Sequence, residues 1–129
     1  MAVMTGFRLT TVLLLTLVVA TGGCTHGDAD AAALTHGGDP ARGKELIRAY
    51  GCGSCHTIPR VPGAESIVGP NLQGIGRRAY IAGVLPNTPE NMMRWIIDPP
   101  GVDDKTAMPN LHVSAREARD IAAYLYTLQ

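Results

Sequence analysis

Hydrophobic and polar positions divide the chain into an apolar N-terminal run, a polar stretch and a C-terminal part with helical periodicity. Leu9–Ala20 is apolar apart from its threonines and follows the single charge of Arg8. A membrane-spanning helix needs roughly 20 apolar residues, so this run is too short to be a good anchor by itself. A basic start, a short apolar run and then small residues are typical of a secretory signal peptide, which we expect over residues 1–23.

Three segments after residue 38 show the spacing of amphipathic helices. Each starts with a capping signal, namely Asp39 before Pro40, Thr88 before Pro89, and the capping box of Ser114 and Glu117. Apolar residues then recur at helical intervals in each segment: Gly43, Leu46, Ile47 and Tyr50; Met92, Met93, Trp95 and Ile96; Ile121, Tyr124, Leu125 and Leu128. Gly51 ends the first helix and Pro99 stops the second.

The stretch between the first two helices, residues 57–87, is rich in proline and glycine and shows no periodicity. So long an irregular segment is unusual inside a compact domain. Only 5% of the residues are aromatic, which supplies little bulk for a core. We therefore expect the chain to wrap around a large apolar group. Without alternating strands or repeats, the fold class is all-α, with three main helices and long irregular loops.

Charge and hydropathy exclude two classes of protein. Eleven basic residues balance eleven acidic ones, so the chain lacks the strongly basic surface that nucleic-acid binding needs. Its mean hydropathy of +0.08 is too low for a protein that crosses the membrane several times. The 129 residues are enough for one exported domain with appendages.

Residues 24–38 separate the leader from that domain. They are rich in glycine, alanine and aspartate and have no apolar periodicity, so we expect a flexible tether. His26 and His36 lie in this segment and are interpreted as bystanders rather than metal ligands. The folded domain is then residues 39–129.

The five residues from Cys52 to His56 carry the chemistry. Their order, Cys-Gly-Ser-Cys-His, has the C-x-x-C-H spacing of covalent haem attachment. Thiols three residues apart on a helical turn reach the two vinyl groups of one haem, and the adjacent histidine binds its iron from the proximal side. One covalent haem c also supplies the bulk that the core lacks.

Three other interpretations of the cysteines are weaker. A thioredoxin-type dithiol would follow a strand in a βαβ pattern, and none precedes Cys52. A zinc site would need a second pair of ligands. A structural disulfide is compatible with export but leaves His56 and the sparse core unexplained.

The second axial ligand is expected from Met108, in the loop before the last helix. Its thioether is a soft ligand that raises the reduction potential of haem, and Pro109 stiffens the loop. Met92 and Met93 lie on a helix at core spacing and are interpreted as packing residues. Two alternatives remain: His112 in a bis-histidine haem, or an open iron site.

Together these motifs resemble the class I c-type cytochromes, the bacterial monohaem cytochromes c. The resemblance covers residues 39–129 and includes Gly69-Pro70-Asn71-Leu72, which matches the family's proximal loop. It implies that the Pro70 carbonyl accepts the N–H of His56 and orients the ring. It also implies that Gly43 is the close-contact glycine where the first helix crosses the last.

The resemblance further implies four supporting residues around the haem. Arg78 and Thr106 match family residues near the propionates, and Trp95 stands where an aromatic side chain lines the pocket. Tyr80 substitutes for a tryptophan that this chain lacks. The ring of lysines of mitochondrial members is absent, since Lys44 and Lys105 are the only lysines.

Ala20-Thr21-Gly22-Gly23-Cys24 resembles a bacterial lipoprotein processing site, although Thr21 stands where an aliphatic residue is usual. The resemblance implies lipidation of Cys24, and ordinary cleavage after Ala20 is the alternative. We expect the domain on the periplasmic side of the cytoplasmic membrane, lipid-anchored or otherwise soluble in the periplasm.

A haem closed by His56 and Met108 leaves no iron position for substrate, so we expect an electron-transfer protein and not an enzyme. The resemblance implies a one-electron carrier between a quinol-oxidising complex or dehydrogenase and a terminal oxidase. The alternative is a tightly bound haem c subunit of a larger respiratory or periplasmic oxidoreductase complex. A haem-based ligand sensor would require Met108 to be absent or displaceable.

Overall fold

The computed structural model describes residues 26–129. Its helices are α1 (His26–Leu34), α2 (Pro40–Ala49), α3 (Pro89–Ile97), α4 (Pro99–Val102) and α5 (Ala115–Tyr126), with the 3-10 turns η1 (Cys52–Ser54) and η2 (Ile75–Arg77). Two short antiparallel strands, β1 (Tyr80–Ile81) and β2 (Leu85–Pro86), pair Tyr80 with Pro86 and Ile81 with Leu85. The mostly helical class is confirmed. The count of three helices is not, because α1 and the short α4 join the predicted α2, α3 and α5.

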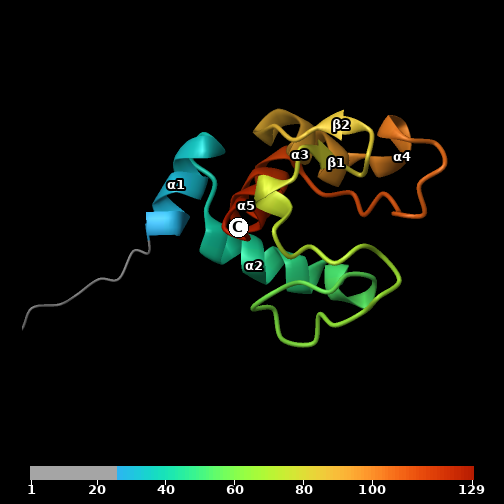
Figure 1. The fold of residues 1–129 in the computed structure, drawn as a ribbon, viewed down its shortest axis with the longest axis horizontal. Coiled ribbons are helices and arrows are strands. Elements are labelled where there is room, and N and C mark those ends of the chain that lie inside the picture. The colour runs from blue at the N-terminus through green and yellow to red at the C-terminus, as the bar shows by residue number, and fades with distance from the viewer. Residues whose placement is uncertain (1–25) are drawn as a thin grey trace, which may run out of the picture.

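The crossing of α2 and α5 forms the centre of the domain (Figure 1). Gly43 lies at this crossing, where a Cβ would collide with the backbone of Asp120 and Ile121. The close approach buries Ile47 to 1% exposure, a burial that contributes roughly 1.5–3 kcal/mol. The expected role of Gly43 as a contact between these two helices is therefore seen.

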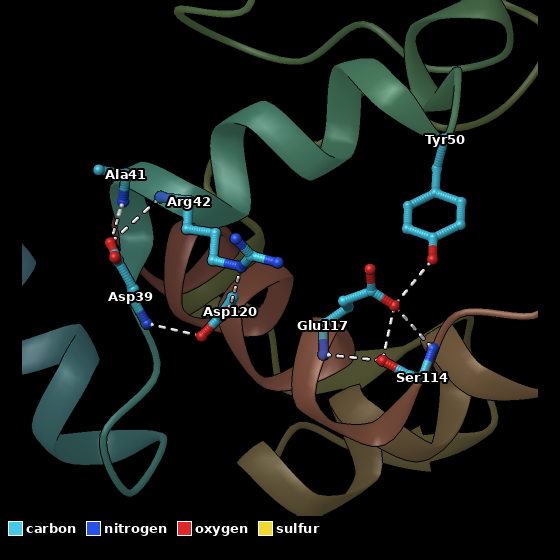
Figure 2. Close-up of polar contacts among 7 residues, drawn as sticks. All are labelled: Asp39, Ala41, Arg42, Tyr50, Ser114, Glu117 and Asp120. Atoms are coloured by element: carbon cyan, nitrogen blue, oxygen red, sulfur yellow. Dashed lines mark hydrogen bonds and ion pairs between the residues drawn. The ribbon is translucent and has the colours of Figure 1, made fainter.

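Asp39 joins the start of α2 to α5. Its carboxylate accepts the N–H groups of Ala41 at 2.9 Å and Arg42 at 3.1 Å, as an N-cap. The N–H of Asp39 donates to the Asp120 carboxylate at 2.9 Å. The same carboxylate forms an ion pair with Arg42 at 3.3 Å (Figure 2). Asp120 is buried, and these partners offset the cost of burying its charge.

The start of α5 is tied to the end of α2 in the same way. Ser114 and Glu117 form the predicted capping box, and the Tyr50 hydroxyl donates to Glu117 at 2.8 Å (Figure 2). Hydrogen bonds from Ser114 and Tyr50 lower the pKa of Glu117. The same bond to Glu117 raises the pKa of Tyr50. The pair therefore holds one charge, on Glu117, over a wide pH range.

The segment expected to be a flexible tether is different in the structure. From His26 to Leu34 it is helix α1, and Ala31 and Thr35 are buried against the domain. Alanine has the highest helix propensity, and its small side chain lets α1 pack closely against α5. The segment therefore forms a helix although it lacks the stripe of large apolar residues by which amphipathic helices are recognised in a sequence. The prediction of an irregular, flexible segment is wrong for this stretch.

Gly38 shows where α1 is anchored. A Cβ there would lie 2.7 Å from the Arg119 carbonyl and 2.8 Å from the Ala123 Cβ, both on α5. His36, which was interpreted as a bystander, lies 3.6 Å from the Glu90 carboxylate on the surface.

The long irregular segment is held by tyrosines of α5. The Tyr124 hydroxyl donates to the Pro59 carbonyl at 2.7 Å, and the Tyr126 hydroxyl donates to Asn87 at 2.8 Å. Burial raises the pKa of Tyr126 to about 12, so its hydroxyl keeps its proton. Asn87 in turn donates to the carbonyls of Ile75 and Arg78. These bonds fix a segment whose only regular structure is η2 and the two short strands.

Within residues 26–129, no helix is long and apolar enough to cross a membrane.

Candidate haem site

A cavity of about 620 Å³ lies between α5, α3 and the irregular segments. Its size falls in the range of cofactor sites. Apolar side chains make up most of its wall, among them Ile47, Ile58, Leu72, Ile75, Ile81, Met92, Ile96, Leu111, Val113, Ile121 and Leu125. The expectation that the chain packs around a large apolar group matches this cavity.

Every site residue predicted within the described part of the chain lines this one cavity. They come from four separate segments: Cys52, Cys55, His56, Pro70, Arg78, Tyr80, Trp95, Thr106 and Met108. Their assembly is a tertiary result, because helix α3 and two loops separate the first of them from the last. Cys24, the predicted lipidation site, lies outside the described residues.

The two thiols are placed by the turn that follows α2. Gly51 takes a left-handed conformation with φ +69°, which glycine adopts without steric cost. The chain then turns into η1, where the N–H groups of Cys55 and His56 both donate to the Cys52 carbonyl. This turn presents both sulfurs and the histidine to the same cavity.

The thiol environment does not suit dithiol redox chemistry. Burial raises the pKa of Cys52, and the neighbouring Cys55 adds to the shift. A redox-active C-x-x-C needs a thiol whose pKa is lowered, and only the two short strands β1 and β2 occur among residues 26–129. The same range contains no cluster of three or more histidine, cysteine or acidic side chains that could hold zinc.

His56 is held from two sides. Its Nδ1 lies 2.7 Å from the Pro70 carbonyl oxygen. Because a carbonyl only accepts, Nδ1 carries the proton and Nε2 keeps a free lone pair for a metal. The contact expected from the resemblance is therefore present.

Gly69 supports the other side of the ring, which sequence reasoning did not anticipate. A Cβ at Gly69 would lie 2.6 Å from Cε1 and 2.8 Å from Nδ1 of His56. The backbone of the proximal loop thus packs directly on the imidazole. The signal in the sequence was the Gly-Pro pair itself, which was interpreted only as a loop motif.

Met108 is positioned by a loop with internal hydrogen bonds. The N–H of Lys105 donates to the Asp103 carboxylate at 3.0 Å, and that of Thr106 donates to the Asp103 carbonyl at 3.1 Å. The Thr106 hydroxyl accepts the N–H of Met108 at 3.2 Å. The two turns fix the backbone that carries the half-buried thioether.

The candidates for the second axial ligand differ in where they lie relative to the cavity. Met92 is buried and lines the cavity, but it projects from the core face of α3. Met93 and His112 are not among the cavity residues, and His112 is exposed. Met108 is therefore better placed than His112 for the second ligand.

Arg78 lies at the cavity edge with its side chain held by the carbonyls of Asn71 and Gln73. Tyr80 is 59% exposed on β1, whereas Trp95 is half-buried on α3. Asn87, which holds η2 and Arg78 in place, was missed because an isolated asparagine in coil gives no local signal.

The residues present fit a haem. Two thiols, a histidine with a free Nε2 and a thioether line one cavity, whose remaining lining is mostly apolar, with Arg78 and Asp103 as the charged side chains. Such a site defines a c-type cytochrome. Residues 40–129 match the Cytochrome c family model, so the chain belongs to the cytochrome c family, whose members bind haem covalently.

Three bacterial proteins that are similar to this chain are each called cytochrome c oxidase subunit 2. The one from Alkalihalophilus pseudofirmus is 32% identical over 89 residues, covering 68% of this chain and 25% of that protein. Those from Bacillus subtilis and Bacillus sp. strain PS3 are 31% and 30% identical over 66% and 70% of this chain. This chain spans about a quarter of their length. No solved structure matches it closely enough to be called similar.

Proposed function

We propose that this chain is an electron-transfer protein, not an enzyme, with one haem c bound through Cys52 and Cys55. His56 and Met108 would be the axial ligands. The observation that carries the proposal is the convergence of these four residues on one apolar cavity in a member of the cytochrome c family. When bound, the haem supplies a single electron by cycling between Fe(III) and Fe(II).

The protein's own residues would limit the structural rearrangement that accompanies electron transfer. The Pro70 carbonyl holds the proton on Nδ1 of His56, and Gly69 limits rotation of the ring. The Asp103 and Thr106 turns hold Met108. Rigid ligands in an apolar wall keep water out and reduce the rearrangement that accompanies each change of charge.

The proposed partners are a quinol-oxidising complex or dehydrogenase as donor and a terminal oxidase as acceptor. Lipidation of Cys24 would place this traffic at the periplasmic face of the cytoplasmic membrane. Cys24 precedes α1 by only two residues. A docked α1 therefore leaves a much shorter link to a lipid than a flexible segment over residues 24–38 would.

A second candidate function is a bound haem c subunit of a larger respiratory complex. It is favoured by the relatives, since the matching segment there is a quarter of a protein named as an oxidase subunit. Purification from the native membrane distinguishes the two functions: a free carrier is recovered alone, whereas a subunit is recovered together with the other subunits of its complex.

Optical spectra of the exported protein, oxidised and reduced, with and without carbon monoxide, test the proposal. We expect sharp c-type bands, the far-red band of sulfur bound to ferric iron, and no change with carbon monoxide. Covalent haem that lacks the far-red band and binds carbon monoxide would contradict the Met108 assignment and favour sensing or catalysis.

A further inference from the structure

Four of the segments that line the cavity carry no charged residue. Residues 49–59, 66–76, 79–89 and 106–111 contain no aspartate, glutamate, lysine or arginine, and each segment contributes to the lining. Among the aspartate, glutamate, lysine and arginine residues, only Arg78 and Asp103 line the cavity, and they are opposite in sign. The side chain of Arg78 is already held by backbone carbonyls.

Large apolar side chains are exposed next to the same cavity. Within residues 26–129, five large hydrophobic residues are exposed, and four belong to these uncharged segments. We call them the rim patch: Ile67 (91% exposed), Val68 (79%), Tyr80 (59%) and Val84 (48%). Val68 and Tyr80 line the cavity, whereas Ile67 and Val84 are next to lining residues in the sequence but are not themselves part of the lining. A group held in the cavity would therefore leave Ile67 and Val84 exposed.

The remaining exposed residue, Leu34, lies on the other side of the domain. It belongs to α1, which approaches α5 at Arg119 and Ala123. The cavity is lined by Ile121 and Leu125 of the same helix. Two residues advance about 200° along an α-helix, so α1 and the cavity occupy opposite faces of α5. In Figure 1, α1 lies at the left of the molecule and the loop after η1 at the lower right, with α5 between them.

We propose that the rim patch is the docking surface for the redox partner, and that the partner's face is apolar and uncharged. The inference rests on the proposed electron-transfer function and adds the partner's chemistry to it. Docking of this kind uses apolar contact and gains little from long-range electrostatic steering.

The distribution of charge around the cavity favours an uncharged protein face over a charged protein or a lipid surface. A partner with a cluster of acidic or basic residues would find no opposite cluster around the cavity. A lipid surface is disfavoured because interfacial binding draws on several lysines and arginines beside the apolar residues. The other charges of the described residues are spread over the helices and the loops between them, with both signs present in the helices and in the loops, so they form no cluster of one sign at the cavity. Apolar contact with a protein face of the same kind is what this surface can offer.

Electron self-exchange tests the proposal without the natural partner, because a second copy presents the same apolar, uncharged face. The rate is measured from the exchange of haem resonances by NMR in mixtures of oxidised and reduced holoprotein. We expect the wild-type rate to change less than about twofold between ~10 mM and ~500 mM salt. The variant Ile67→Lys/Val84→Lys should exchange about tenfold more slowly at low salt and recover at high salt.

A matched control adds the same charge on the opposite face. Ala33 and Leu34 are exposed on α1, and Ala33→Lys/Leu34→Lys should exchange at close to the wild-type rate. Equal slowing in the two variants would overturn the proposal, since net charge and not the rim patch would then control the encounter. A stable dimer in sedimentation equilibrium would overturn it by assigning the patch to a second copy. Binding of the wild-type protein to vesicles of neutral and anionic phospholipid, if Ile67→Lys/Val84→Lys abolished it, would also overturn the proposal by assigning the patch to a membrane.

An optical redox titration separates this inference from the proposed function. A reversible Fe(III)/Fe(II) couple with self-exchange insensitive to the rim variant would overturn the docking surface alone. Absence of a reversible couple would overturn the proposed function and the docking surface together.

Discussion

Gly43 of α2 lies directly against the backbone carbonyl of Asp120 in α5, with no space for a Cβ between them. The obstacle is backbone, which cannot move aside as a side chain can. The two helices are therefore locked at one crossing point, which also aligns Ile47, Ile121 and Leu125 on the cavity wall.

Replacement of Gly43 by alanine should destabilise the protein. Forcing a methyl group into this contact is expected to cost roughly 1–3 kcal/mol or more, which exceeds the ~1 kcal/mol that alanine gains in helix propensity. Urea denaturation of the holoprotein measures the change. Gly27→Ala is the control, because no atom lies within 4 Å of its added Cβ. Equal stability of the two variants would contradict the crossing.

Gly69→Ala should disturb the histidine without removing it. The added methyl would press on Cε1 of His56, so we expect a displaced ring and a weakened bond to Pro70 with haem still attached. Because that hydrogen bond raises the basicity of the imidazole, weakening it should raise the midpoint potential. Potentiometry and NMR of the haem resonances report these effects. Pro70→Ala retains the accepting carbonyl and should change them much less. A Gly69→Ala protein with wild-type potential and resonances would show that the loop does not orient the ring.

Met108→Ala should keep the covalent haem but lose the far-red band, lower the potential and allow carbon monoxide to bind the reduced protein. The reason is loss of the soft thioether ligand. Met93→Leu, which alters a methionine outside the cavity, should leave the spectrum unchanged. If His112→Ala rather than Met108→Ala opened the iron, the ligand assignment would be wrong.

Glu117 should give the domain an acid-side dependence of stability. Its pKa is lowered in the folded state by Ser114 and Tyr50, so its contribution is fully present above the unfolded-state value of about 4.3. That contribution is lost as the pH falls through the lower folded value. Urea midpoints measured across the acid range should fall less steeply in Glu117→Gln. Glu65→Gln, at an exposed loop position, should retain the wild-type slope.

Helix α1 should detach when its contact at Gly38 is blocked. The bulk of valine at this position would meet the Arg119 carbonyl and Ala123, so Gly38→Val should raise hydrogen exchange in residues 26–38. The haem spectrum should stay unchanged, because α1 lies on the opposite face of α5 from the cavity. Protection equal to wild type would contradict the docking of α1.

Local signals were enough to place the three main helices and the haem motif. The caps at Asp39, Thr88 and Ser114 act within a few residues of each helix start, and helical periodicity marks which face is apolar. The spacing of Cys52, Cys55 and His56 is equally local. Such features depend on hydrogen bonds and geometry inside one turn, so they can be recognised without the fold.

Tertiary structure decided what distant segments do to one another. Ala31, Thr35 and Gly38 have no apolar stripe to announce α1, and only α5 gives them a surface to pack on. Gly69 gains its role from a ring thirteen residues earlier, and the uncharged segments become one rim only when the chain brings them around the cavity. Sequence alone determined the three main helices and the cofactor-binding motif, because these rest on neighbouring residues. The support of the ligand and the surface around it required the fold, because they rest on contacts between residues that the chain itself holds far apart.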